Sequence, residues 1–160
     1  MFKAKAHTIL GTFLVLVALA LPMQAAAGDQ VPLNGSETGT FRILGPCEAS
    51  GIIVDVTGTG HSTQVGKYSV HYRECFVPAT GAVTGGSFTL TAANGDMLFG
   101  TYGGQAVPTG DANVIVFDDP GVITGGTGRF AGASGIANTA GVANLATGEY
   151  TSTISGSLSA

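Results

Sequence analysis

The chain has 160 residues, of which 44% are hydrophobic and only 10% are charged, and its formal net charge is −4. This length fits one domain with a hydrophobic core of its own. With six basic against ten acidic residues, the chain lacks the clustered Lys and Arg that a nucleic-acid surface needs, so nucleic acid is not expected as a partner.

Residues 1–27 have the pattern of a cleaved secretory signal peptide. Lys3 and Lys5 precede an uncharged apolar run at 9–21, and small alanines follow at 25–27. A membrane anchor is the alternative, but a spanning helix needs about 20 apolar residues, more than this run offers. We therefore expect cleavage after Ala27 and an exported protein, secreted or periplasmic, with no membrane attachment.

Residues 28–36 are polar and are expected to form a flexible lead-in, and residues 37–160 a single β-domain. Short segments rich in Thr, Val and Ile alternate with Gly-rich turns, and no segment has a convincing helical period. Eight strands are expected, at residues 37–44, 50–57, 65–76, 84–92, 97–103, 113–118, 131–140 and 147–158.

Turn chemistry separates these strands. Asn94-Gly95 tolerates the positive φ angles of a tight hairpin, and 118–121, with the sequence Asp-Asp-Pro-Gly, is a second turn signal. Residues 58–60 and 78–81 mark two more expected connections.

Alternation of side chains predicts which faces are buried. In 67–74, Lys, Ser, His and Arg alternate with Tyr, Val, Tyr and Glu, so one face of this strand is expected to face water. Residues 52–54 and 114–117 are apolar on both faces, which is typical of strands covered on both sides by a partner subunit or another layer. Many short, evenly spaced strands predict either a closed barrel or a β-sandwich.

Cys47 and Cys75 are the only cysteines. In an exported protein they are expected to form a disulfide, which would stabilise the fold by roughly 3 to 4 kcal/mol. A metal site is the weaker alternative, because no CxxC occurs and His61 and His71 lack a recognised ligand spacing. A catalytic thiol is weaker still, and both histidines are expected to be solvated.

A Gly-rich string at 125–135 is the most distinctive motif. It does not fit GxGxxG, no βαβ unit surrounds it, and it lacks the Asp of a calcium-binding nonapeptide. The pattern favours a sharp bend followed by a closely packed strand. Arg129 is expected to anchor this bend through Asp118 or Asp119.

Residues 122–135, VITGGTGRFAGASG, resemble the GGTGxFxGAxG segment of the allene oxide cyclase and dirigent family. The segment 58–68 is also similar to small exported bacterial proteins with that barrel. The resemblance implies an eight-stranded antiparallel closed β-barrel with an apolar cavity, often in trimers. In relatives, the cavity binds an epoxy fatty acid, steers phenoxy-radical coupling or cyclises polyketides. The catalytic residues of that family lie outside the matched segment, so none is assigned here.

Titratable or phenolic residues on otherwise apolar faces are the candidate ligand-binding residues. A carboxylate in an apolar barrel could serve as a general acid or base with a raised pKa. The alternative is that these side chains cap the barrel mouth or bond to the backbone. The candidates are Asp55, Tyr68, Tyr72, Glu74 and Tyr102.

Three functions follow from these patterns. The first is a binding module that holds an apolar or aromatic small molecule in the barrel. The second is a cyclase or isomerase resembling allene oxide cyclase, and the third is a structural or surface protein that forms oligomers. No cofactor or metal is expected, and a homo-oligomer is left open.

Overall fold

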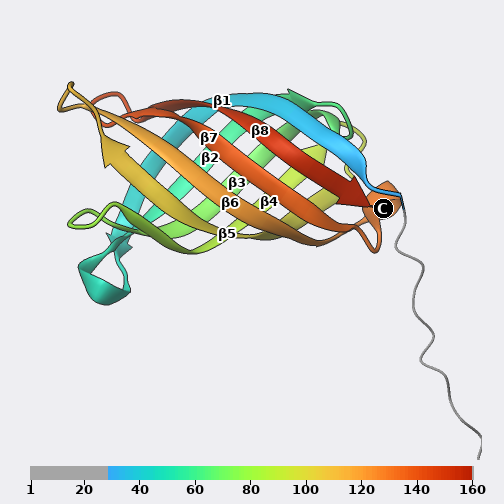
Figure 1. Cartoon of the computed structure of the whole chain (residues 1–160), viewed down its shortest axis with the longest axis horizontal. Coiled ribbons are helices and arrows are strands. Elements are labelled where there is room, and N and C mark those ends of the chain that lie inside the picture. Colours follow the sequence, from blue (N-terminus) through green and yellow to red (C-terminus); the bar gives the residue numbers. More distant parts are fainter. Residues whose placement is uncertain (1–28, 160) are drawn as a thin grey trace, which may run out of the picture.

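The computed structural model describes residues 29–159, which form a closed barrel of eight antiparallel strands (Figure 1). Each strand pairs with the next along the chain, and β8 closes the barrel on β1. The predicted signal peptide lies outside the described residues. The strands are β1 (Val31–Pro46), β2 (Ile52–Ser62), β3 (Gly66–Val77), β4 (Ala82–Ala92), β5 (Met97–Pro108), β6 (Val114–Gly126), β7 (Ser134–Asn144) and β8 (Glu149–Ser159).

This architecture confirms the closed antiparallel barrel and excludes the β-sandwich. Each of the eight expected strands overlaps one observed strand. Asn94-Gly95 forms the tight β4–β5 hairpin, in which Gly95 has a φ of +89°. Residues 78–81 connect β3 to β4, also as expected. Two short 3-10 helices, η1 (Glu48–Ser50) and η2 (Gly128–Phe130), lie in the β1–β2 and β6–β7 connections.

Three predicted boundaries are wrong. The flexible lead-in at 28–36 is largely strand, because β1 begins at Val31 and Leu33 is buried in the core. Residues 58–60 lie inside β2 and residues 118–121 lie inside β6, so neither segment is a turn. In all three cases, Gly, Pro or Asn predicts an interruption of the strand but lies inside a long barrel strand.

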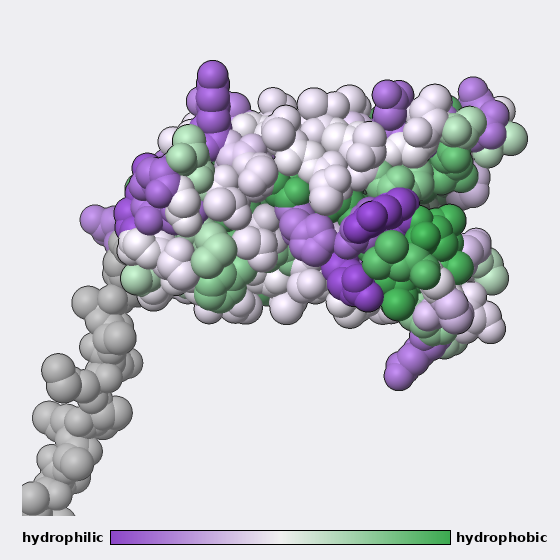
Figure 2. Space-filling model, turned by 180° about the vertical axis from the view of Figure 1, so that it is seen from behind, coloured by the Kyte–Doolittle hydropathy of each residue, from purple (hydrophilic) through white to green (hydrophobic). Residues whose placement is uncertain are grey.

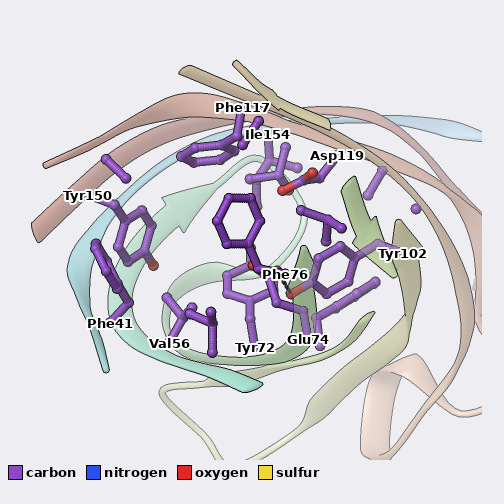
Figure 3. A pocket seen from close by; sticks show the side chains of 18 of the residues that line it. Phe41, Val56, Tyr72, Glu74, Phe76, Tyr102, Phe117, Asp119, Tyr150 and Ile154 are labelled. Carbon is purple, nitrogen blue, oxygen red and sulfur yellow. Dashed lines mark hydrogen bonds between the residues drawn. The ribbon is translucent and has the colours of Figure 1, made fainter. Parts of the chain in front are cut away.

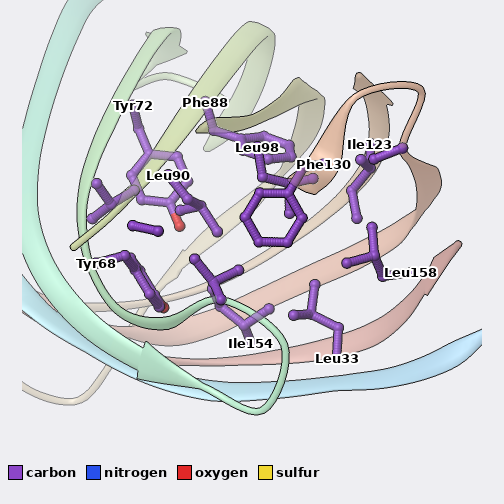
Figure 4. Close-up of a cluster of buried hydrophobic side chains, with 14 residues drawn as sticks. Leu33, Tyr68, Tyr72, Phe88, Leu90, Leu98, Ile123, Phe130, Ile154 and Leu158 are labelled. Atoms are coloured by element: carbon purple, nitrogen blue, oxygen red, sulfur yellow. The ribbon is translucent and has the colours of Figure 1, made fainter. Parts of the chain in front are cut away.

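A hydrophobic core fills one end of the barrel (Figure 4). At this end lie the β2–β3, β4–β5 and β6–β7 connections, together with the C-terminal end of β8 (Figure 1). Phe130 of η2 packs in the core together with Leu33, Leu98 and Leu158. The Gly-rich segment therefore supplies a plug for the barrel end, and the bend expected there is η2 itself.

Interior glycines make room for aromatic rings on other strands. A Cβ at Gly86 would lie 2.7 Å from the ring of Tyr102, and a Cβ at Gly100 would lie 2.7 Å from the ring of Phe88. A Cβ at Gly58 would lie 2.5 Å from the Tyr150 hydroxyl. These glycines let aromatic side chains from other strands lie across the barrel wall.

The disulfide between Cys47 and Cys75 is present, with 6.0 Å between the two Cα atoms. It ties the η1 loop to the end of β3, at the barrel end opposite the core. A Cβ at Gly51 would lie 2.7 and 2.8 Å from the two sulfur atoms, so glycine is required beside the bridge. A persisting disulfide fits an oxidising compartment.

The face seen in Figure 2 is mostly of intermediate hydropathy, with scattered hydrophilic side chains and with hydrophobic residues gathered near the η1 end. The alternation expected in 67–74 is confirmed, since Lys67, Ser69, His71 and Arg73 are exposed. In 114–117, Ile115 and Phe117 face the barrel interior and Val116 remains 41% exposed on the outside. The partner predicted for this outer face stays a prediction. Within residues 29–159, no helix has the length and apolar character to cross a membrane.

Candidate functional site: an apolar cavity in the open half of the barrel

The half of the barrel opposite the core encloses a cavity of about 360 Å³ (Figure 3). All eight strands contribute to its wall, and the wall is apolar except for six side chains. Ile43 and Leu145 line the cavity and are 60% and 48% exposed, so the cavity opens to solvent at this end. The six polar lining residues are Tyr72, Glu74, Tyr102, Asp119, Thr139 and Tyr150.

Glu74 and Tyr102 form a hydrogen-bonded pair on this wall. The Tyr102 hydroxyl donates to Glu74 Oε2 at 2.5 Å. Burial raises the pKa of Glu74, and the hydrogen bond from Tyr102 opposes this effect. Burial, with the charge of Glu74, also raises the pKa of Tyr102, so the phenol keeps its proton and acts as a donor at neutral pH.

Asp119 is the least satisfied polar residue of the cavity. It is only 9% exposed, and its Oδ1 atom is buried without a hydrogen-bond partner among the described residues. A Cβ at Gly104, on the neighbouring β5, would clash with this oxygen, so glycine there leaves room for the carboxyl group. Burial raises the pKa of Asp119 to about 7, and the charges of Glu74 and Asp118 act in the same direction.

Tyr150 and Tyr72 complete the polar set. The Tyr150 hydroxyl is buried and unpaired within the described part of the chain, and in Figure 3 it lies across the cavity from Asp119. Tyr72 lines the cavity with its ring, while its hydroxyl lies 2.9 and 2.8 Å from the two carboxyl oxygens of Glu37. Tyr68 and Ser152 also donate to Glu37. The buried Glu37 carboxyl group therefore accepts hydrogen bonds from three side chains.

The structure brings three of the five predicted site residues together. Tyr72, Glu74 and Tyr102 line the cavity, as expected from their places on inward faces. Tyr68 is inward but lies in the core cluster, where it donates to Glu37 at 3.0 Å. Asp55 does not face the cavity.

The Asp55 side chain faces outward from β2, because its neighbours Val54 and Val56 both line the cavity and side chains alternate along a strand. It is nevertheless only 5% exposed. Its carboxyl group lies 2.7 Å from His71 Nε2 and 2.9 Å from Arg42 Nε. Hydrogen bonds from His71 and Arg42 lower the pKa of Asp55. His71, expected to be solvated, is therefore also part of a surface ion-pair network.

Arg129 does not contact Asp118 or Asp119. Its Nη2 atom donates to the backbone oxygen of Val65 at 2.7 Å, and its Nε atom lies 3.9 Å from Asp96. It therefore anchors η2 to the β2–β3 and β4–β5 hairpins at the filled end of the barrel. The expectation of an anchoring role is correct and the expected partners are wrong.

Sequence reasoning missed Asp119 and Tyr150 as cavity residues. Asp119 was assigned to a turn, although Ile115, Phe117 and Asp119 have the spacing of one strand face. That alternation was the signal that could have found it. For Tyr150, nothing in the pattern of its own strand indicates that its hydroxyl lacks a partner.

Chemically, the cavity offers two carboxyl groups in apolar surroundings, one of them paired with a phenol. Between residues 29 and 159, no group of three or more His, Cys, Asp or Glu side chains could hold a metal ion. The arrangement can desolvate an apolar molecule, accept hydrogen bonds from it, and take up a proton at Asp119 near neutral pH.

The fold and cavity define a small closed antiparallel barrel with an internal, solvent-connected site. Comparison of the chain with family models, curated proteins and solved structures found no match.

Proposed function

We propose that this protein is an exported binding module that holds an apolar or aromatic small molecule inside the barrel. The observation that carries the proposal is the apolar cavity of about 360 Å³ that opens to solvent. This volume falls within the roughly 300–1,000 Å³ of small-molecule sites, which combine apolar walls with a few polar groups. The disulfide and the signal-like N-terminus support the exported location.

The division of the barrel into two halves also supports binding. The core cluster fills one half with the chain's own side chains, which supplies a closed floor. Phe41, Phe76 and Phe117 line the other half, and in Figure 3 the ring of Phe76 projects toward the middle of the barrel between the other two. Burying a ligand against these walls would gain about 25 cal/mol for each Å² of apolar surface removed from water.

The resemblance of residues 122–135 to the allene oxide cyclase and dirigent family points in the same direction, because those barrels hold small molecules in their cavity. We extend the proposal to membership of that barrel family. The apolar cavity supports a binding function without this resemblance.

A fluorescence titration tests the binding function. N-phenyl-1-naphthylamine is a neutral aromatic dye that becomes brighter in apolar surroundings. The wild-type protein should bind it saturably, and Ala143→Phe should abolish binding, because Ala143 lines the cavity and a phenyl group would occupy it. Val142→Phe is the matched control, since Val142 is the next residue of β7 and points outward with 42% exposure.

Circular dichroism would first establish that both variants fold. Binding that is lost in Ala143→Phe and kept in Val142→Phe supports the cavity. Equal binding by both variants would place the dye elsewhere and overturn the proposal.

Asp119 favours a second candidate function, an isomerase or cyclase that uses a carboxyl base. Its pKa of about 7 and its unpaired, buried Oδ1 suit a group that exchanges protons with a bound molecule. The Glu74–Tyr102 pair would supply a neighbouring donor and acceptor.

Kemp elimination of 5-nitrobenzisoxazole tests for such a base without knowledge of the natural substrate. A carboxylate removes the C3 proton while the N–O bond breaks, and the product is a coloured cyanonitrophenolate. Catalysis should increase as the pH rises through about 7 and should be lost in Asp119→Asn. A rate equal to that of free acetate would remove the enzymatic candidate and leave the binding function standing.

A further inference from the structure

We propose that the ligand of this cavity is an apolar amine, an alkyl- or arylalkylammonium ion whose positive head lies at Asp119 and Glu74. This inference rests on the proposed function, because it names the chemical class that the binding cavity selects. Three observations carry it: the sign of the charges in the wall, the unpaired oxygen of Asp119, and the aromatic rings around the two carboxyl groups.

The charged residues in the cavity wall are all acidic. Within residues 29–159, Glu74 and Asp119 are the two charged residues that line the cavity, and no Lys, Arg or His lines it. Arg42 and Arg73 project from the outer surface, and Arg129 binds Val65 at the filled end of the barrel. A ligand carboxylate would therefore meet two acids and no counterion, whereas an ammonium head would meet two partners of opposite charge.

The unpaired oxygen of Asp119 needs a donor. A buried polar atom without a hydrogen bond is costly, and the great majority of such atoms in folded proteins are paired. The wall leaves Oδ1 without a partner in residues 29–159, although Asp119 is about nine-tenths buried. An ammonium group offers three N–H donors and no acceptor, so a head bound at the Asp119 carboxyl group keeps further donors for a second acceptor.

Glu74 is available as that second acceptor. In Figure 3, Asp119 of β6 and Glu74 of β3 lie above and below Tyr102 on one side of the view, and the charge of Glu74 contributes to the raised pKa of Asp119. The Tyr102 hydroxyl occupies Glu74 Oε2 and orients the carboxyl group.

Aromatic rings line the rest of the site. Figure 3 shows Tyr72, Phe76, Tyr102 and Phe117 around the space beside the two carboxyl groups. Ring faces attract cations, and this attraction grows when the cation is removed from water. The combination of acids and rings suits an ammonium ion with an apolar body better than a neutral alcohol, which brings no positive charge to an ionised carboxyl group or to the ring faces.

Three compounds with one common body test the inference by calorimetry at pH 8, where Asp119 is mainly ionised. They are 4-phenylbutylamine, 4-phenylbutanol and 4-phenylbutyrate. The amine, with a pKa of roughly 10, is protonated at this pH. We expect it to bind at least about tenfold more tightly than the alcohol, a difference of about 1.4 kcal/mol. The carboxylate is expected to bind most weakly.

Asp119→Asn and Glu74→Gln should each reduce the preference for the amine over the alcohol while the alcohol still binds. Asp118→Asn is the matched control, because Asp118 is the adjacent acid but accepts a hydrogen bond from Asn138 outside the cavity. It should leave the preference unchanged.

The outcomes separate the two proposals. Equal or tighter binding of the alcohol or the carboxylate overturns the amine inference and leaves the binding function intact. An amine preference that survives in both cavity variants also overturns it. If none of the three compounds binds and the naphthylamine dye fails as well, the proposed function itself falls.

Discussion

Tyr102 on β5 reaches across β4 to donate a hydrogen bond to Glu74 on β3, with 2.5 Å between the two oxygens. Its ring crosses β4 at Gly86, the residue paired with Tyr102 in the β4–β5 ladder. The curvature of a closed barrel makes this contact between non-adjacent strands feasible. The position of the Glu74 carboxyl group in the cavity therefore depends on Tyr102 and on Gly86, the glycine of β4 that the Tyr102 ring crosses.

Replacing Tyr102 with Phe should raise the pKa of Glu74 further. The hydrogen bond from Tyr102 stabilises the ionised carboxyl group against the effect of burial, so its loss favours the protonated form. Carbon-13 NMR titration of labelled Glu side chains measures this shift. Tyr68→Phe is the control, because Tyr68 donates to Glu37, and it should leave the Glu74 titration unchanged. A Glu74 titration that is identical in wild type and Tyr102→Phe contradicts the account.

Gly86→Ala should disturb the hydrogen bond between Tyr102 and Glu74, although neither of these residues is replaced. The new Cβ would lie 2.7 Å from ring atoms of Tyr102 and 2.7 Å from its backbone oxygen, so the ring must move. We expect a loss of roughly 1–3 kcal/mol in unfolding free energy, as for other overpacked sites. Gly110→Ala, where a Cβ meets no atom within 4 Å, should change stability by less than about 0.5 kcal/mol. Urea unfolding measures both, and equal effects would refute the packing argument.

Asp119→Asn should make the protein more stable at pH 8 than the wild type. The pKa of Asp119 is raised from 3.8 to about 7, chiefly by burial, so the folded state holds this proton where the unfolded state has released it. Wild-type stability should therefore fall as the pH rises from about 4 to about 7, by at most roughly 4 kcal/mol from this group. Glu37 and Glu74, whose pKa values are also raised by burial, act in the same direction.

Unfolding measured between pH 4 and pH 8 should show a flatter profile for Asp119→Asn than for wild type. Asp118→Asn should retain most of the wild-type slope, because burial is the main cause of the raised pKa of Asp119 and the charge of Asp118 makes a smaller contribution. An unchanged slope in Asp119→Asn would show that this carboxyl group titrates normally.

Replacing both Cys47 and Cys75 with Ser should lower the unfolding free energy by about 3 kcal/mol, because the bridge closes a loop with a sequence separation of 28. Urea unfolding of the oxidised wild type and the double variant measures the difference. Under reducing conditions the two proteins should unfold at similar urea concentrations. A double variant as stable as the oxidised wild type would mean that the loop is held by its other contacts.

The strands could be predicted because their ends carry ordinary turn chemistry. Asn94-Gly95 forms the expected hairpin, and the alternation in 67–74 identifies the inner face of β3. The failures come from glycine and proline inside strands. Gly58 and Gly60 lie beneath the hydroxyl groups of Tyr150 and Tyr68, a packing role that a local pattern cannot distinguish from a turn.

Pro120 is a similar case, because it is typical of a turn and yet lies inside β6. It pairs with Asn138 of β7, whereas the β5–β6 ladder has Cα pairs at Gly121 and Asp118 and none at Pro120. A residue without an N–H group is tolerated where the ladder is interrupted. Because the pattern at 118–121 predicts a turn, it gives no indication that Asp119 lines a cavity.

The site could be predicted only as far as the faces of single strands. Tyr72, Glu74 and Tyr102 were found because each has apolar neighbours on its own face. Asp55 was misplaced because residues 52–56 are apolar around it on both faces, and only the positions of Val54 and Val56 in the cavity wall fix its direction. The pairing of Glu74 with Tyr102 depends on the curvature of three strands, which no local pattern contains.

The most direct test of the account is a methyl NMR titration of the labelled protein with 4-phenylbutylamine. The account predicts saturable shifts concentrated at Val56, Ile115 and Ile154, whose side chains line the cavity, and little change at Val116 and Ile136, which are exposed on the outside. Shifts confined to the outer methyl groups, or no saturable shifts while the protein remains folded, would contradict the claim that the barrel cavity is a binding site for apolar amines.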